Sequence, residues 1–127
     1  MLDPARRNKS DSGRRAYLSG QAGEDSAIRA YEDLGVRLLA QRWRGASGEI
    51  DLILQAPETL IFCEVKTCRS FAAAAHRISQ AQMQRIYQTA EEFLGQQPQG
   101  ALTPSRFDAA LVDGFGRVEI IANAFGQ

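Results

Sequence analysis

The chain has few of the residues that mark several common functional classes. Its 127 residues include two cysteines, one histidine and two lysines. Cys63 and Cys68 fit neither a CxxC motif nor a zinc-ligand spacing, so we expect no zinc site and no disulfide framework. No apolar run approaches the roughly 20 residues that span a bilayer. We therefore expect a cytoplasmic protein that has no membrane segment and packs Cys63 as a small apolar residue.

The chain also lacks an excess of charge of either sign. A formal net charge of zero argues against a protein that coats nucleic acid by bulk charge. Residues 1–20 nevertheless hold five basic and two acidic residues. We predict that residues 1–15 form a flexible basic arm, that they are not a secretory signal, and that residues 16–127 form a single domain. Thirteen of the 15 cations are arginine, which suits phosphate contacts but is equally explained by a genome rich in G and C.

Apolar periodicity predicts the element order αβββαββ. The first helix is expected from about residue 19 to 34, with an apolar stripe through Ala22, Ala27, Ile28, Tyr31 and Leu34. Strands are expected at 36–43, 48–54 and 60–66, followed by a helix at 80–95 with Ser79 as its N-cap. A last strand pair, 106–112 and 117–125, is expected around a turn at 113–116. This order predicts a mixed sheet with helices on its faces.

Two neighbouring strands are apolar on both faces and yet carry charges. GEIDLIL (48–54) contains Asp51, and LIFCEVK (60–66) contains Glu64 and Lys66. An antiparallel hairpin closing at 57–58 would place Asp51 opposite Glu64, and Glu49 opposite Lys66. Two facing carboxylates repel unless one is protonated or a cation lies between them, and such oxygen ligands suit Mg²⁺ or Mn²⁺. A register slip of one residue would separate them.

The motifs around these charges resemble a known superfamily. GQAGEDSA (20–27), GEIDLI (48–53), CEVKTCRS (63–70) and RFDAALV (106–112) together resemble the PD-(D/E)xK, or restriction-endonuclease-like, superfamily. Within it, the chain is similar to the YraN-like family of small uncharacterised bacterial proteins. The resemblance covers roughly residues 17–112 and implies an α/β fold with a mixed central sheet flanked by helices.

The chain departs from the superfamily pattern at three places. Ile50 precedes Asp51 where the superfamily is named for a Pro-Asp pair. A QxxxY motif on the second helix is not met. Relatives often start that helix with basic residues, whereas this chain has Gln80 and Gln82 there.

The resemblance implies a metal-dependent nuclease that cleaves phosphodiester bonds in DNA, with branched or damaged DNA as candidate substrates. Asp51, Glu64 and the backbone carbonyl of Val65 would hold Mg²⁺ or Mn²⁺, while Lys66 orients or activates the attacking water. Glu24 would face the metal from the first helix. Candidate phosphate contacts flank these residues: Arg42, Arg44, Arg69 and Arg77. Junction-cutting relatives dimerise, which adds a homodimer as a hypothesis by analogy.

Each candidate has a structural alternative. Asp51, Glu64 and Lys66 could form a buried ion cluster, although such clusters stabilise proteins poorly. Glu24 could favour the helix dipole near a helix start, and Glu49 could partner Lys66 or only cover the start of its strand. At the level of function, the alternative is a non-catalytic nucleic-acid-binding or adaptor protein with the same fold. The neutral net charge and the glutamines at the helix start favour that alternative.

Three further residues are expected to have structural roles. Asp108 should pair with Arg106 on the same face of its strand and lock the final strands together. Trp43 should belong to the core, with stacking on an unpaired base as the alternative. His76, the sole histidine, should lie at the surface or near a helix cap.

Overall fold

A computed structural model describes residues 20–71 and 78–125 of the chain. These residues form a mixed five-stranded sheet in the order β1-β2-β3-β4-β5, in which β3 and β4 are parallel and the other neighbours antiparallel. The strands are β1 (Arg37–Arg44), β2 (Glu49–Gln55), β3 (Leu60–Thr67), β4 (Ser105–Val112) and β5 (Val118–Ile121). The predicted fold class and element order are therefore confirmed. The predicted arm at 1–15 lies outside the described residues, as do His76 and Arg77.

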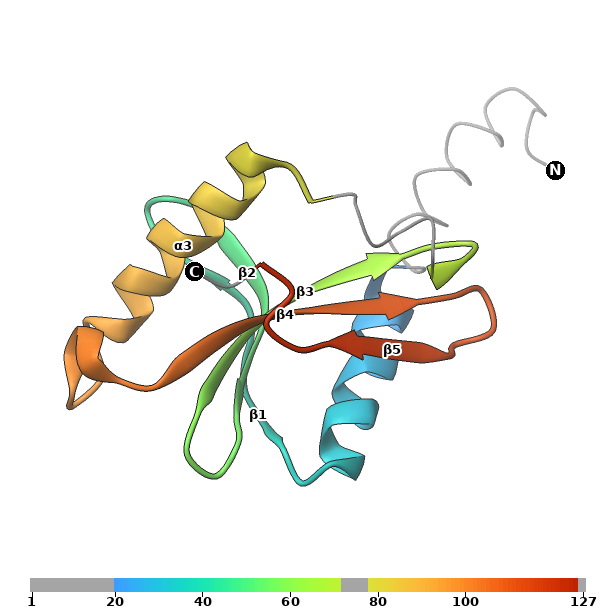
Figure 1. The fold of residues 1–127 in the computed structure, drawn as a ribbon, viewed down its shortest axis with the longest axis horizontal. Coiled ribbons are helices and arrows are strands. Elements are labelled where there is room, and N and C mark those ends of the chain that lie inside the picture. Colours follow the sequence, from blue (N-terminus) through green and yellow to red (C-terminus); the bar gives the residue numbers. More distant parts are fainter. Residues whose placement is uncertain (1–19, 72–77, 126–127) are drawn as a thin grey trace, which may run out of the picture.

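Helices cover both faces of the sheet, as Figure 1 shows. Helical residues 20–33 pack Ala27 and Tyr31 against Leu52, Leu54, Ile61 and Cys63. On the other face, α3 (Gln80–Leu94) packs Ile86, Ala90, Phe93 and Leu94 against Ile50, Ile53, Leu60 and Phe62. A short 3-10 helix, η1 (Gly100–Leu102), leads into β4. The central strands β2 and β3 are apolar on both sides because each side is covered by a helix.

The local signals for α3 act as predicted. Ser79 is its N-cap, and its side chain accepts a hydrogen bond from the backbone N–H of Gln82 at 3.1 Å. The apolar residues Ile86, Ala90, Phe93 and Leu94 of α3 face the core, and the ring of Phe93 packs edge-on against Trp43 at 5.4 Å between centroids. Trp43 therefore has the predicted core role. Cys63 is also fully buried, as expected for a small apolar residue.

The stripe predicted on the first helix is wrong at both ends. Ala27 and Tyr31 are fully buried, but Ala22 is exposed and Leu34 is 70% exposed. Leu34 lies in the turn after the last helical residue, so the 3.6-residue period no longer directs its side chain to the core.

Both hairpins have the predicted turns. In the first, the pairs Leu52–Cys63 and Gln55–Leu60 match the register expected for closure at 57–58. In the second, the Asp113 side chain accepts hydrogen bonds from the N–H groups of Phe115 and Arg117, each at 2.9 Å. The strand after this turn was predicted at 117–125 and is shorter: β5 runs over Val118–Ile121.

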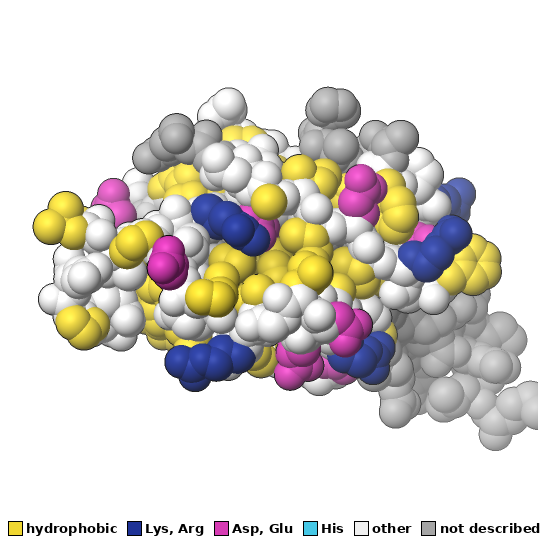
Figure 2. Space-filling view, turned by 60° about the horizontal axis from the view of Figure 1, so that its bottom comes forward, with side chains coloured by type: hydrophobic (Ala, Val, Ile, Leu, Met, Phe, Trp, Pro, Cys, Tyr) yellow, Lys and Arg dark blue, Asp and Glu magenta, His cyan; other side chains and the backbone are white. Residues whose placement is uncertain are grey.

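Charged side chains of both signs are interspersed on the surface shown in Figure 2. They surround an apolar centre, and neither sign forms a continuous stripe on this face. Neither helix in the described part of the chain has the length and apolar composition to cross a membrane.

A buried polar network ties the first helix to β4. Asp108 has no exposed surface, and it accepts hydrogen bonds from the Tyr31 hydroxyl at 2.7 Å and from Arg106 Nε at 3.0 Å. The backbone N–H of Asn123 donates to the same carboxylate at 2.9 Å. The predicted Arg106–Asp108 pair is therefore confirmed, and it also holds the segment after β5. Every donor here compensates part of the cost of burying the carboxylate.

We predict that Tyr31→Phe lowers the free energy of unfolding by about 1.5 to 3 kcal/mol, the usual worth of a hydrogen bond to a charged group. Urea denaturation of the full chain measures this loss. Leu102→Ala, which removes a side chain that is 86% exposed, is the control and should change stability by less than about 0.5 kcal/mol. A Tyr31→Phe protein as stable as the wild type would show that the network contributes nothing to stability.

Candidate functional site

The strands β2 and β3 separate at Asp51 and Glu64. Their backbone pairing ends at Leu52 and Cys63, and side chains bridge the strands beyond that point. Asp51 Oδ2 accepts a hydrogen bond from the N–H of Val65 at 2.8 Å, and the N–H of Asp51 donates to Glu64 Oε1 at 3.3 Å. The split therefore brings both carboxyl groups into one opening of the sheet.

The alternation of side chains along β2 also breaks at Asp51. Ile50 and Leu52 are two residues apart and would share a face in a regular strand. Ile50 instead packs on the α3 side, whereas Leu52 packs against helix 20–33. Because of this irregularity, the Asp51 side chain turns toward Glu64 while Ile50 and Leu52 both stay buried.

The two carboxyl groups strongly perturb each other. Glu64 is only 6% exposed, and burial, reinforced by the charge of Asp51, raises its pKa to about 8. Burial also raises the pKa of Asp51, with the charge of Glu24 acting in the same direction. Each carboxyl group accepts a hydrogen bond from the backbone of the opposite strand, which places the two groups close enough to influence each other's pKa. A proton shared by the pair at neutral pH is the expected consequence, and a cation would take its place.

Lys66 and Gln82 complete the α3 side of the opening. Lys66 Nζ lies 3.5 Å from Gln82 Oε1, and Gln82 Nε2 lies 3.5 Å from Glu64 Oε2. Glu64 and Lys66 therefore share a face of β3, as the alternation predicts. Within the described ranges, no ion pair joins Lys66 to either carboxylate.

Gln82 is a site residue that the sequence analysis missed. The spacing Ser79-x-x-Gln82 is that of a capping box, which directs the glutamine back to the N-cap. Only the proximity of β3 redirects the side chain toward Glu64 and Lys66. The only signal in the sequence was its place at the helix start, where relatives carry basic residues.

Glu24 lies near the opening but is held by β1. It is 7% exposed and accepts hydrogen bonds from Gln41 Nε2 at 2.9 Å and from Arg42 Nε at 3.1 Å. Arg42 adopts a left-handed backbone conformation, with φ of 51°, where it lies across from Asp51 in the β1–β2 pair. The charge of Glu24 reaches Asp51, as the raised pKa of Asp51 shows, while its hydrogen bonds go to Gln41 and Arg42.

The other flanking charges are scattered. Arg44 pairs with Glu49 at 3.0 Å, so the expected pairing of Glu49 with Lys66 is wrong. The reason is that β2 is no longer paired with β3 at Glu49. There β2 is still paired with β1, which places Arg44 opposite Glu49. Arg69 follows β3 and is exposed, and it forms no ion pair with a described acid.

The donor set fits an open cation site better than a closed one. No group of three or more His, Cys, Asp or Glu side chains in residues 20–71 and 78–125 is placed to hold a metal ion. Two carboxylates and a backbone carbonyl are nevertheless typical of Mg²⁺, which keeps several waters. In a strand, the N–H and C=O of one residue point to the same neighbour. Because the N–H of Val65 points to Asp51, its carbonyl points to the same opening.

Comparisons with known proteins match the part of the chain that holds this site to one protein family. Residues 23–112 match the profile of a family described as "Uncharacterised protein family UPF0102". A UPF0102 protein of Cereibacter sphaeroides is 55% identical over 114 residues, which cover 90% of this chain and 97% of its own. One from Ruegeria pomeroyi is 52% identical over 115 residues, covering 91% and 94%. Another from Dinoroseobacter shibae is 46% identical over 122 residues, covering 96% and 91%.

We predict that the cation-free protein loses stability as pH rises from about 4.5 to about 8. The pKa of Glu64 is about 8 in the folded protein against 4.5 as its ordinary value, so the folded state holds more protons across this window. The contribution of Glu64 to the free energy of unfolding is therefore complete below its ordinary pKa. It is lost as the pH rises through its pKa in the folded protein.

The sign of this pH dependence is tested by measuring the free energy of unfolding at the two ends of the pH window, with a chelator present. Glu64→Gln should flatten the pH dependence because the amide does not titrate. Glu49→Gln, which alters another carboxylate at the same end of the sheet, should keep the wild-type slope. If the free energy of unfolding of Glu64→Gln depended on pH as steeply as that of the wild type, Glu64 would not be the cause of the dependence.

Proposed function

Because the chain belongs to the uncharacterised protein family UPF0102, whose description names no activity, we propose a function from the site itself. We propose that the protein is a metal-dependent nuclease that cleaves phosphodiester bonds in DNA. The observation that carries this proposal is the pair of cross-strand hydrogen bonds that bring the carboxyl groups of Asp51 and Glu64 into one opening, with Lys66 on the same face of β3 as Glu64. The family match also confirms the resemblance inferred from the sequence motifs.

The ligands proposed for Mg²⁺ or Mn²⁺ are Asp51, Glu64 and the carbonyl of Val65. When bound, the cation would act as a Lewis acid at a phosphate oxygen and lower the pKa of a bound water. The protein orients the ligands through its backbone: the N–H of Val65 fixes Asp51, and the N–H of Asp51 fixes Glu64. Ligands held this way need no rearrangement when the cation arrives.

Lys66 is the proposed positioning and charge-stabilising group. Its ammonium contacts the neutral amide of Gln82 and no described carboxylate, so its charge is available for a phosphate oxygen or an attacking water. A preorganised cation aimed at developing charge is an effective source of transition-state stabilisation. A purely structural ion cluster would instead pair the ammonium directly with Glu64 or Asp51.

Glu24 and the arginines have secondary places in this proposal. Glu24 would face the cation only after exchanging its bonds to Gln41 and Arg42, so we assign it an electrostatic influence on Asp51. Among the candidate arginines that the structure describes, Arg69 is the one left for a phosphate, because Arg42 and Arg44 are paired with Glu24 and Glu49. Branched or damaged DNA stays a candidate substrate on the family resemblance.

A non-catalytic nucleic-acid-binding or adaptor protein is the second candidate. It is favoured by the bonds that tie Glu24 to β1 and by Gln82 at the α3 start, where a nuclease would gain from a basic residue. The net charge of zero acts in the same direction. Both candidates share the fold, and they differ in whether bound DNA is cut.

We predict metal-dependent nicking of DNA that Asp51→Asn lowers by about 100-fold or more, because the loss removes a cation ligand. The assay incubates the full chain with linear, single-stranded and four-way-junction DNA, with Mg²⁺ or Mn²⁺ and with chelator. Glu58→Gln, a change in the β2–β3 turn, is the matched control and should cut at the wild-type rate. Binding without cutting under every metal condition would favour the adaptor.

A further inference from the structure

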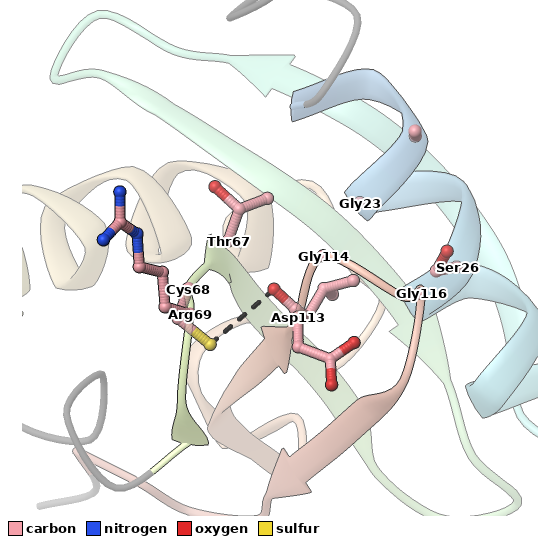
Figure 3. A pocket seen from close by; sticks show the side chains of 10 residues that line it. Gly23, Ser26, Thr67, Cys68, Arg69, Asp113, Gly114 and Gly116 are labelled. Atoms are coloured by element: carbon pink, nitrogen blue, oxygen red, sulfur yellow. Dashed lines mark hydrogen bonds between the residues drawn. The ribbon is translucent and has the colours of Figure 1, made fainter.

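A pocket of about 570 Å³ opens beside the candidate site, as Figure 3 shows. Helix 20–33 contributes Gly23 and Ser26, the end of β3 contributes Thr67 and Arg69, and the β4–β5 turn contributes Gly114 and Gly116. Its volume falls within the roughly 300 to 1,000 Å³ of sites that enclose small molecules. Of its lining residues, only Arg69 has a place in the nuclease proposal.

The pocket is continuous with the site along β3. Thr67 directly follows Lys66, and the parallel partners of these residues in β4 are Val112 and Leu111. Gly23 directly precedes Glu24 on the helix. Alternation sends the Lys66 side chain toward α3 and the Thr67 side chain toward helix 20–33. The pocket therefore lies around the end of the sheet from the two carboxyl groups.

Glycines give the pocket walls made of backbone. A Cβ on Gly23 would lie 3.0 Å from the Thr67 methyl group, so the helix and β3 approach closely there. A Cβ on Gly114 would meet nothing within 4 Å, so the space in front of it is open. Gly116 has φ of +80°, which few other residues adopt, and its Cβ position is 3.8 Å from Ser26 Oγ. Such flat walls accept a planar group.

An exposed aromatic ring projects from the same turn. Phe115 lies between Gly114 and Gly116 and is 87% exposed. Its N–H is held by the Asp113 carboxylate, and the Arg117 guanidinium lies 5.4 Å from the centre of its ring. The same carboxylate binds the N–H and guanidinium of Arg117, so the charge of Asp113 is compensated and the turn is rigid. A fixed, exposed ring with a cation beside it is a stacking surface for a nucleobase.

Charge complementarity favours a nucleic acid strand over an apolar partner. Arg69 lies across the pocket from Ser26 in Figure 3, and its guanidinium points away from helix 20–33. Arg117 lies on the Phe115 side. Arg69, which forms no ion pair with a described acid, suits a phosphate that flanks a base stacked on Phe115.

We propose that Phe115 and the adjoining pocket bind an unpaired nucleobase of the DNA strand that enters the site, with Arg69 on a flanking phosphate. The inference rests on the proposed function and narrows its substrate to DNA with single-stranded or splayed nucleotides. A base inside a duplex is stacked on both sides and does not reach the ring.

The test measures DNA binding by fluorescence anisotropy, with the full chain in chelator so that no cleavage occurs. The wild type should bind a single-stranded oligonucleotide more tightly than the duplex of the same sequence. Phe115→Ala should weaken single-strand binding about 5- to 150-fold, the usual loss for one base stacked on an aromatic ring. Phe115→Trp should keep it, and Gly114→Leu should weaken it by filling open space in the pocket.

Leu102→Ala is the matched control, since Leu102 is 86% exposed and lies before β4, whereas Phe115 lies after it. It should bind like the wild type. Equal single-strand affinity in Phe115→Ala and wild type would overturn the inference, as would a wild type that binds no single strand. The two proposals fail separately: cutting without dependence on Phe115 refutes only this one. Binding that depends on Phe115, without cutting in any metal, refutes only the nuclease.

Discussion

The constraint on which the site depends is that the carboxyl groups of Asp51 and Glu64 meet in one opening of the sheet, each bonded to the backbone of the opposite strand. Apolar residues on both faces of β2 and β3 force these strands to the centre of the sheet, and the two acids go inside with them. Burial raises both pKa values, with the charge of Asp51 adding to this effect at Glu64 and the charge of Glu24 adding to it at Asp51, so the ionised pair is unfavourable unless a proton or a cation is bound. The parting of the strands gives the acids a shared opening, and the backbone N–H groups of Asp51 and Val65 hold them in it.

The topology brings the other functional groups to this one end of the sheet. Because β3 and β4 are parallel, the ends of both strands lie together, and the turn with Phe115 follows there. The helix start beyond Ser79 delivers Gln82 from one face, and helix 20–33 delivers Glu24 from the other. In the middle of β4, on the face covered by helix 20–33, the network around Asp108 holds the same helix in place through Tyr31.

Much of this arrangement was predictable because it depends on local rules. The turn at 57–58 sets the β2–β3 register, Ser79 caps α3, and the spacing of Arg106 and Asp108 puts them on one face. The remainder depends on contacts between distant elements. The left-handed Arg42, its hold on Glu24 and the turn of Gln82 toward β3 have no local signal. Leu34 was misassigned because the helix ends one residue earlier than its apolar period indicates.

The most direct test of the Asp51–Glu64 arrangement is to titrate Mn²⁺ into the cation-free full chain. Electron paramagnetic resonance measures the binding, at a pH above the pKa of Glu64, which is about 8. The account predicts a single bound ion per chain in the wild type and its loss in Asp51→Asn. Below that pKa, binding should weaken because the ion must displace the shared proton. A wild type that binds no Mn²⁺, or an Asp51→Asn protein that binds it equally well, would contradict the account.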